Sequence, residues 1–236
     1  MQYALSDLHG CYDLYLKALT AINFNENDTL YVVGDVCDRG PKPMQILLDM
    51  QKKPNIIPLL GNHDYFALNM LKKVMFAKEN NKKPFLPEND LLSLYYWLND
   101  GGRSTYDGFC NLSKIEQNRI ISYLESFKRY EQIIVNNQKY LLVHAGLGNF
   151  EIKKSLTKYT DEELLFDRLD YHQKYFDDQI IVTGHTPTIL IDQSYKNKIY
   201  INNNNIGLDC GAVFFNTLGI YCFDNQKCYY VTQKTL

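Results

Sequence analysis

The sequence has no long hydrophobic run and no marked excess of charge of either sign. No apolar stretch approaches the ~20 residues that a membrane-spanning helix needs, and the amino terminus has no basic region followed by an apolar one. With 25 basic and 27 acidic residues, the formal net charge is -2, which offers no general attraction to nucleic acid or to anionic membranes. These absences predict a cytoplasmic protein that binds neither nucleic acid nor a membrane.

Cysteine is present, but it is neither dense nor regularly spaced. The six cysteines are scattered, without the paired spacing of a zinc site or the density of a disulfide-rich secreted domain. We therefore expect reduced thiols. Cys37 alone is a candidate for a redox role, because it lies inside the Gly-Asp-x-x-Asp-Arg-Gly motif described below, where a reactive thiol would make the site sensitive to oxidants.

Length and hydrophobic pattern favour a single α/β domain over residues 1–236, because single cores keep growing up to roughly 250 residues. Five short β-rich runs each end at a polar motif; they are Tyr3–Leu5, Thr29–Val33, Ile56–Leu60, Tyr140–Val143 and Gln179–Thr183. Ligands bind at the carboxyl ends of strands in open α/β sheets, so we expect these five strand ends to share one site.

The remaining pattern predicts two packed mixed β-sheets flanked by helices. Helical periodicity covers Tyr12–Ile22, Pro43–Lys53 and Tyr65–Ala77. A hairpin is expected around residues 131–143, and the late segment favours antiparallel strands at Ile199–Ile201, Ile206–Cys210, Leu218–Phe223 and Tyr229–Thr232. Residues 72–127 predict a helical insert over the site, with solvent-facing lysines near its start at Lys72, Lys73, Lys78, Lys82 and Lys83.

Acidic residues follow the first two predicted strands. Asp7 and His9 are two positions apart, so on an extended chain both can face one cation. Asp35 follows Gly34, and its two carboxylate oxygens can bridge two cations. Each signal is weak alone, because Asp is also common in turns.

A second group of residues suits a phosphate substrate. Arg39, between Asp38 and Gly40, can present a planar fork to a phosphate group. Asn62 and His63 are neighbours, and on an extended backbone they project to opposite sides, so Asn62 can bind a metal while His63 faces substrate. Near a carboxylate such as Asp38, His63 can stay protonated as a general acid.

Histidines recur at the strand ends. His144 and His185 each follow a predicted buried strand, although for either one alone a hydrogen-bonded structural histidine is equally expected. Four of the five histidines are placed in this way. The fifth, His172, lies in a polar region and is assigned no role.

The motifs, in this order, resemble those of the calcineurin-like metallophosphoesterases. They read Asp-x-His, Gly-Asp-x-x-Asp-Arg-Gly, Gly-Asn-His-Asp, His-Ala-Gly and Gly-His-Thr. The phosphoprotein phosphatase branch is most similar, in particular the small phage lambda-type and bacterial serine/threonine phosphatases. These share the opening Asp-Leu-His-Gly-Cys-Tyr and a late Asp-x-Gly-Ala-Val-Phe string, here residues 209–214. The resemblance implies the four-layer sandwich of that family.

The resemblance also implies a two-metal site. A first cation would be bound by Asp7, His9 and Asp35, and a second by Asp35, Asn62, His144 and His185. His63 and Asp38 would form the catalytic pair, and Arg39 and Arg168 would bind the substrate phosphate, Arg168 on the basis of the short string Phe-Asp-Arg. Manganese is the first choice of metal, since it accepts mixed carboxylate, amide and imidazole ligands, while iron or zinc fit the same geometry.

The prediction that follows is a metal-dependent phosphomonoester hydrolase, specifically a serine/threonine protein phosphatase acting on a phosphorylated protein or peptide. A hydroxide held between the cations would attack phosphorus, and His63, oriented by Asp38, would protonate the leaving alkoxide. A dinucleoside tetraphosphatase with a nucleotide substrate is one alternative. Asp38 favours the phosphatase, because the bacterial tetraphosphatases usually have Ala before Arg-Gly and an anhydride needs less help for its leaving group. A metal-free scaffold is the other alternative, which the retention of every ligand disfavours.

Overall fold

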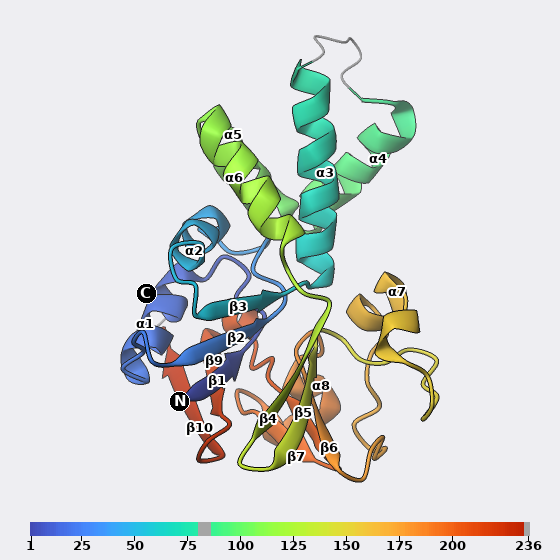
Figure 1. Cartoon of the computed structure of the whole chain (residues 1–236). Helices are drawn as coiled ribbons and strands as arrows, with labels where there is room; N and C mark the ends of the chain where they lie inside the picture. The colour runs from blue at the N-terminus through green and yellow to red at the C-terminus, as the bar shows by residue number, and fades with distance from the viewer. Residues whose placement is uncertain (80–85, 234–236) are drawn as a thin grey trace.

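Figure 1 shows a computed structural model in which two β-sheets lie below a group of helices; the structure describes residues 1–79 and 86–233. The first sheet contains β1 (Gln2–Leu5), β2 (Thr29–Val33), β3 (Ile56–Leu59), β9 (Thr217–Cys222) and β10 (Lys227–Thr232), in the order β10-β9-β1-β2-β3. The second contains β4 (Tyr130–Val135), β5 (Gln138–Val143), β6 (Gln179–Thr183), β7 (Tyr200–Asn202) and β8 (Asn205–Gly207), in the order β4-β5-β6-β8-β7. Both sheets mix parallel and antiparallel pairs, which confirms the predicted fold class.

Alternate residues of the strands face two different cores, as the period of a β-strand requires. In β1, Ala4 belongs to the core between the sheets, whereas its neighbours Tyr3 and Leu5 belong to the outer core. Phe223, which follows β9, connects the sheets. Its ring lies 4.8 Å from the ring of Tyr140 in the second sheet and 6.2 Å from that of Tyr31 in the first, measured between centroids.

Helices cover the outer face of the first sheet. They are α1 (Tyr12–Ala21), which buries Leu14, Tyr15 and Ala18, and α2 (Pro43–Met50), which begins with the proline expected in a first turn. Residues 147–171 pack on the outer face of the second sheet. The only α-helix in that segment is the short α7 (Asp161–Leu165), so this layer is mostly loop.

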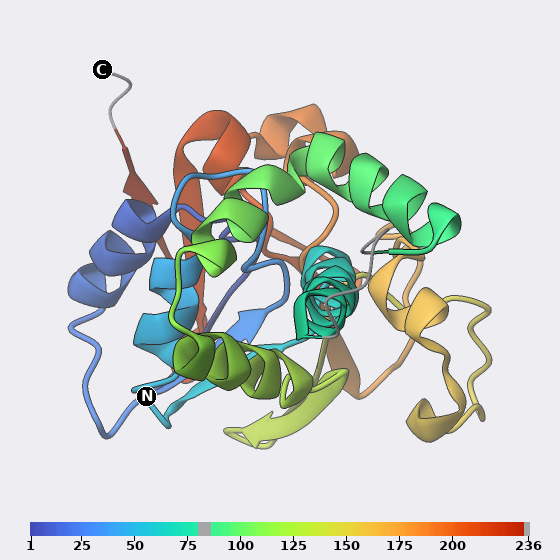
Figure 2. The same cartoon turned by 90° about the horizontal axis from the view of Figure 1, so that it is seen from above.

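Residues 62–125 form the helical insert, which starts earlier than predicted. Within the described residues it contains α3 (Asn62–Glu79), α4 (Glu88–Trp97), a π-helical turn (Leu98–Gly102), α5 (Arg103–Cys110) and α6 (Lys114–Glu125). Its two ends meet at the edge of the first sheet, where the Leu60 N–H donates to the Lys128 carbonyl at 2.7 Å. Figures 1 and 2 show these helices above the sheets.

The lysines at the start of the insert face water where they are described. Lys72 pairs with Glu125 and Lys73 with Asp90, each at 2.6 Å, and both lysine side chains are exposed. The side chain of Lys78, and Lys82 and Lys83, lie outside the described residues. In the described ranges, no helix has the length and apolar character needed to cross a bilayer.

The late strands pair in antiparallel fashion, as predicted, but the two pairs belong to different sheets. The strands β7 and β8 lie in the second sheet, while β9 and β10 lie in the first. After the short α8 (Thr188–Ile191) and the strands β7 and β8, the helix α9 (Ala212–Phe215) carries the chain from one sheet to the other. Turn residues in a sequence indicate a hairpin but not which sheet it joins, and here β8 pairs in parallel with β6.

Phe223→Ala is expected to destabilise the protein by about 3–5 kcal/mol, because it removes a ring that is 1% exposed and leaves a cavity between the sheets. Urea unfolding measures the effect. Ile152→Ala is the control: its side chain is 65% exposed, so a change within about 0.5 kcal/mol is expected. Equal effects of the two substitutions would contradict this account of the core.

Candidate metal centre

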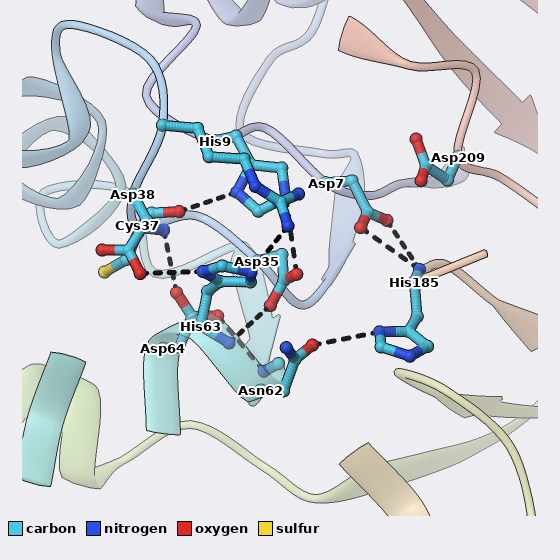
Figure 3. Close-up of polar contacts among 12 residues, drawn as sticks. Asp7, His9, Asp35, Cys37, Asp38, Asn62, His63, Asp64, His185 and Asp209 are labelled. Carbon is cyan, nitrogen blue, oxygen red and sulfur yellow. Dashed lines mark hydrogen bonds and ion pairs between the residues drawn. The ribbon is translucent and has the colours of Figure 1, made fainter. Parts of the chain in front are cut away.

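The carboxylate of Asp35 lies between two groups of predicted ligands at the ends of the central strands. Its Oδ2 atom is 3.5 Å from Nε2 of His9, and its Oδ1 atom is 3.4 Å from Nε2 of His144. Figure 3 shows Asp35 at the centre of this arrangement. One oxygen therefore faces each group, which is the geometry that a bridging carboxylate requires.

The second group converges on the side-chain oxygen of Asn62. Nε2 of His144 lies 2.9 Å from Asn62 Oδ1, and Nδ1 of His185 lies 3.0 Å from it. Donor atoms of Asp35, His144 and His185 all lie within 4.8 Å of one another. The structure thus brings together Asp35, Asn62, His144 and His185, the residues predicted for the second cation.

Backbone carbonyls fix the tautomers of two of these histidines. Nδ1 of His9 lies 2.9 Å from the Cys37 carbonyl, and Nδ1 of His144 lies 3.0 Å from the Val33 carbonyl. Each Nδ1 therefore carries a proton, which leaves a lone pair on each Nε2. The Nε2 atom of His144 faces Asp35 Oδ1 at 3.4 Å, while the Nε2 atom of His9 accepts from Arg39 at 2.6 Å. Facing lone pairs on nitrogen and oxygen repel one another unless a cation or an added proton lies between them. The donor set therefore fits a divalent metal ion.

The electrostatics also favour positive charge at this position. Burial opposes the protonation of His144, but the charges of Asp35 and Asp7 outweigh it and raise its pKa to about 10. Burial lowers the pKa of His9 and of His185 to about 3, which keeps both imidazoles neutral and able to act as ligands. Burial raises the pKa of Asp7 to about 6, since a buried carboxylate without a cation is costly.

Asp7 is placed differently from the sequence argument. Both of its carboxylate oxygens accept from the backbone N–H of His185, at 3.0 and 3.2 Å. On the His9 side of Asp35, the possible metal ligands whose donor atoms lie within 4.8 Å of one another are His9, Asp35 and His63. The assumption of an extended chain is wrong, because Asp7 and His9 have φ of 52° and 38°. Asp7 as a ligand stays a prediction.

The predicted site residues carry unusual backbone strain. Among the described residues, fifteen other than glycine have positive φ, of which eight are Asn and one is Gln226. The remaining six are all predicted site residues: Asp7, His9, Asp35, Asp38, Arg39 and His185. A left-handed conformation costs a non-glycine residue roughly 1–2 kcal/mol. Strain of this kind concentrates at functional sites, and this group identifies the site without reference to side-chain chemistry.

His63 and Asp38 form a buried pair. His63 Nδ1 donates to Asp38 Oδ2 at 2.8 Å. Burial opposes the protonation of His63, but the hydrogen bond to Asp38 and the charge of Asp35 raise its pKa. The sequence argument for separate roles of Asn62 and His63 assumed an extended backbone, whereas both residues lie in the first turn of α3. Helical geometry separates their side chains instead.

The two predicted phosphate-binding arginines lie at different distances from the centre. Arg39 Nη1 donates to His9 Nε2 at 2.6 Å and Nη2 to His63 Nε2 at 2.9 Å, so its guanidinium joins the metal group to the acid pair. Arg168 lies at the edge, where Nη1 donates to Thr186 Oγ1 at 3.5 Å, next to His185. The phosphate-binding role of both residues stays a prediction.

Four further residues order the site, and the sequence argument missed their contribution. Asp64 is fully buried and accepts from the backbone N–H groups of Val36, Cys37 and Gly61, which ties the loop after β2 to the loop after β3. The sequence indicated Asp64 only as the last residue of the Gly-Asn-His-Asp motif. Asp209 is also buried, and burial together with the charge of Asp7 raises its pKa.

The other two come from the helical insert, and no local motif could have revealed them. The indole N–H of Trp97 donates to Asp38 Oδ2 at 2.9 Å, and the hydroxyl of Thr105 donates to Asp38 Oδ1 at 2.7 Å. They lie 59 and 67 residues from Asp38 in the sequence. Together with His63 they hold both oxygens of the Asp38 carboxylate.

None of the six cysteines takes part in a disulfide, which agrees with the expectation of reduced thiols. Cys37 is buried, and burial raises its pKa well above that of an ordinary thiol. A thiol in this environment reacts slowly, because the thiolate is the reactive form. The structure therefore gives no support to an oxidation-sensitive role for Cys37.

Comparison with known proteins places this arrangement in context. A family model described as calcineurin-like phosphoesterase matches residues 3–188. A symmetrical bis(5'-nucleosyl)-tetraphosphatase of Wigglesworthia glossinidia brevipalpis is 38% identical over 99 residues, which cover 41% of this chain and 36% of that protein. The Nitrosomonas europaea protein of the same name is 28% identical over 157 residues, which cover 65% of this chain and 47% of that protein. The chain therefore spans less than half the length of these curated relatives.

A solved structure agrees with the fold. It is provisionally described as a diadenosine tetraphosphatase and superposes with a TM-score of 0.66 over 98% of this chain and 92% of its own, at 18% identity. The family match supports the predicted divalent metal ions and hydrolase chemistry. The choice of manganese stays a prediction.

The relatives contradict the predicted serine/threonine protein phosphatase. The two curated relatives described above are both named as symmetrical tetraphosphatases, and neither name supports a protein substrate. The argument from Asp38 is wrong because a pair that protonates a leaving group is compatible with either substrate.

Manganese is expected to raise the melting temperature of the wild-type protein by roughly 5–10 °C at a concentration near 100 times its dissociation constant, because it binds only the folded state. Asp35→Asn should lose most of this shift, since it removes the oxygen charge between His9 and His144. Differential scanning fluorimetry measures the shift, and elemental analysis measures the bound metal.

Asp178→Asn provides the matched control for this experiment. Asp178 forms a surface ion pair with Lys139, its side chain is 70% exposed, and the same chemical change there should leave the manganese shift intact. If Asp35→Asn kept the full manganese-induced rise in melting temperature, Asp35 would not be a metal ligand.

Proposed function

Because the chain belongs to the calcineurin-like phosphoesterase family, we propose that it is a two-metal hydrolase of phosphoanhydride bonds, with dinucleoside polyphosphates as its substrate class. The observation that carries the chemistry is the convergence of Asn62, His144 and His185 beside one oxygen of Asp35 while the other oxygen faces His9. The names of the curated relatives support the substrate class.

The residues present fit two divalent cations. Asp35 would bridge them, with Asp7 and His9 completing one site and Asn62, His144 and His185 completing the other. When bound, such ions lower the pKa of water towards ~7 and neutralise charge on the phosphate oxygens. Manganese suits the mixture of carboxylate, amide and imidazole ligands.

The side chains around the cations bind and orient the substrate. The guanidinium of Arg39 donates to both His9 and His63, so it lies between the metal ligand and the proposed acid and can hold phosphate oxygens close to both. Arg168, beside Thr186, can hold a second part of the polyphosphate. These contacts align the reacting phosphorus, which is the larger part of catalysis in phosphoryl transfer.

His63 supplies the proton for the leaving group. Asp38 accepts from Nδ1 of His63, and Nε2 accepts from Arg39 in the free protein. When Arg39 turns to the substrate phosphate, Nε2 can take up a proton, because the pKa of His63 is raised, and can give that proton to the departing oxygen. The leaving group of a phosphoanhydride is itself a phosphate, which is a weaker base than an alkoxide. His63 therefore assists the reaction but is less essential for an anhydride than for an alkyl ester.

The purified protein with Mn²⁺ is expected to hydrolyse diadenosine tetraphosphate with a kcat/KM at least roughly tenfold above that for a phosphoserine peptide, because one extra recognition contact is worth about that factor. Chromatography of the nucleotides and assay of released phosphate measure the two rates. Asp35→Asn, which should be inactive on both, controls for contaminating enzymes. Preference for the peptide would overturn the proposed substrate class.

His63→Asn is expected to slow the hydrolysis of phenyl phosphate by roughly 10²–10⁴-fold, the usual contribution of a general acid, and that of p-nitrophenyl phosphate by much less. p-Nitrophenolate is the better leaving group and needs less protonation. Steady-state rates on the two esters give the ratio, and elemental analysis should show unchanged metal content. An equal loss on both esters would assign His63 another role.

A further inference from the structure

A pocket of about 300 Å³ lies beside the proposed acid, between α3 and α4. It is lined by His63, Phe66, Ser93, Tyr96, Trp97 and Asp100. Its volume is within the range of small-molecule sites, about 300–1,000 Å³. Apart from His63 and Trp97, the residues that line it have no role in the proposed chemistry.

Helical spacing explains why these side chains share one pocket. His63 and Phe66 are three positions apart on α3, and Ser93, Tyr96 and Trp97 have the spacing of one face of α4. Figures 1 and 2 show α3 and α4 as neighbours in the insert above the sheets.

The walls of the pocket are aromatic. Phe66 is 44% exposed and Tyr96 is 63% exposed, although both are large apolar side chains. Trp97 is 5% exposed and anchored by its hydrogen bond to Asp38. Aromatic side chains of this kind stack on nucleobases with little dependence on the base, since every base has a flat π face.

The end of the pocket next to the metal centre suits a ribose. The carbonyl of Gly101, the residue after Asp100, accepts from the Arg39 backbone N–H at 2.8 Å, so Asp100 lies at this end. A carboxylate accepts hydrogen bonds from ribose hydroxyls in other nucleotide sites. It also repels phosphate, which keeps the polyphosphate at Arg39 and outside the pocket.

We propose that this pocket binds the nucleobase of the leaving nucleoside diphosphate. The base lies between Phe66 and Tyr96, the ribose lies near Asp100, and the terminal phosphate reaches His63. The proposal rests on the proposed function for the identity of the substrate. The presence of His63 in the wall of the pocket assigns the base to the leaving-group side of the reaction.

The chain contains its own probe for this pocket. Trp97 is its single tryptophan and lines the pocket, so a stacked base should change the fluorescence of the protein. ADP, added with Mn²⁺, is expected to quench the emission in a saturable way. Inorganic tripolyphosphate, which has no base, is expected to compete for the phosphate contacts with little quenching.

Tyr96→Ala and Tyr95→Ala form a matched pair. The two side chains are neighbours, 63% and 62% exposed, but only Tyr96 lines the pocket. Tyr96→Ala is expected to weaken ADP binding at least tenfold. It should also lower by the same factor the ratio of kcat/KM for diadenosine tetraphosphate to that for inorganic tripolyphosphate. Tyr95→Ala should change both quantities less than twofold.

The two measurements separate this proposal from the proposed function. Saturable quenching by ADP that Tyr96→Ala weakens would support the pocket even if diadenosine tetraphosphate were a poor substrate. Rapid hydrolysis of that substrate with equal ADP affinities in the two variants would overturn the pocket and leave the proposed function standing. Quenching by a tyrosine-containing peptide without phosphate, and not by ADP, would also overturn it and assign the pocket to a peptide side chain.

Discussion

The buried carboxylate of Asp35 is the group on which the arrangement of this protein depends. Its oxygens face His9 on one side and His144 on the other, and Oδ1 also accepts from the His63 N–H in the first turn of α3, at 3.0 Å. A buried charge is stable only with such partners, and the positive end of an 18-residue helix is one of them. The sheets and α3 are therefore coupled through one side chain.

The strain in the surrounding loops has the same origin. Asp7, His9, Asp35 and His185 come from three different strand ends, and each has a left-handed backbone that turns its side chain inward. Hydrogen bonds between the loops hold these conformations, such as the one from the His185 N–H to Asp7 and those from the loop after β2 to Asp64. The folded sheets thus offset a cost of roughly 1–2 kcal/mol per residue, and a cation shared by these side chains would offset more of it.

Sequence patterns could predict the elements that depend on local periodicity. β2 and β6 have the predicted bounds, and the motifs at the ends of β1, β2, β3, β5 and β6 could be located because polar residues interrupt apolar runs there. Contacts between distant segments could not be predicted. The extended-chain argument failed at Asp7 and His63 because tertiary contacts set the backbone there, and the partners of Asp38 come from residues 59 and 67 positions away. Periodicity carries no information about such pairs.

The motifs alone led to the wrong substrate because they do not reach the surfaces that could distinguish one phosphorylated substrate from another. The motifs encode the metal group and the acid pair, which a protein phosphatase and a tetraphosphatase can share. Trp97 lies between these two parts of the molecule, because its indole N–H donates to Asp38 while the residue lines the pocket between α3 and α4. One side chain from the insert thus contacts both the residue that orients the acid and the surface available to substrate. If the pocket binds substrate as proposed, selectivity and acid positioning would be coupled, because a substitution that displaces Trp97 would alter both the hydrogen bond to Asp38 and the lining of the pocket.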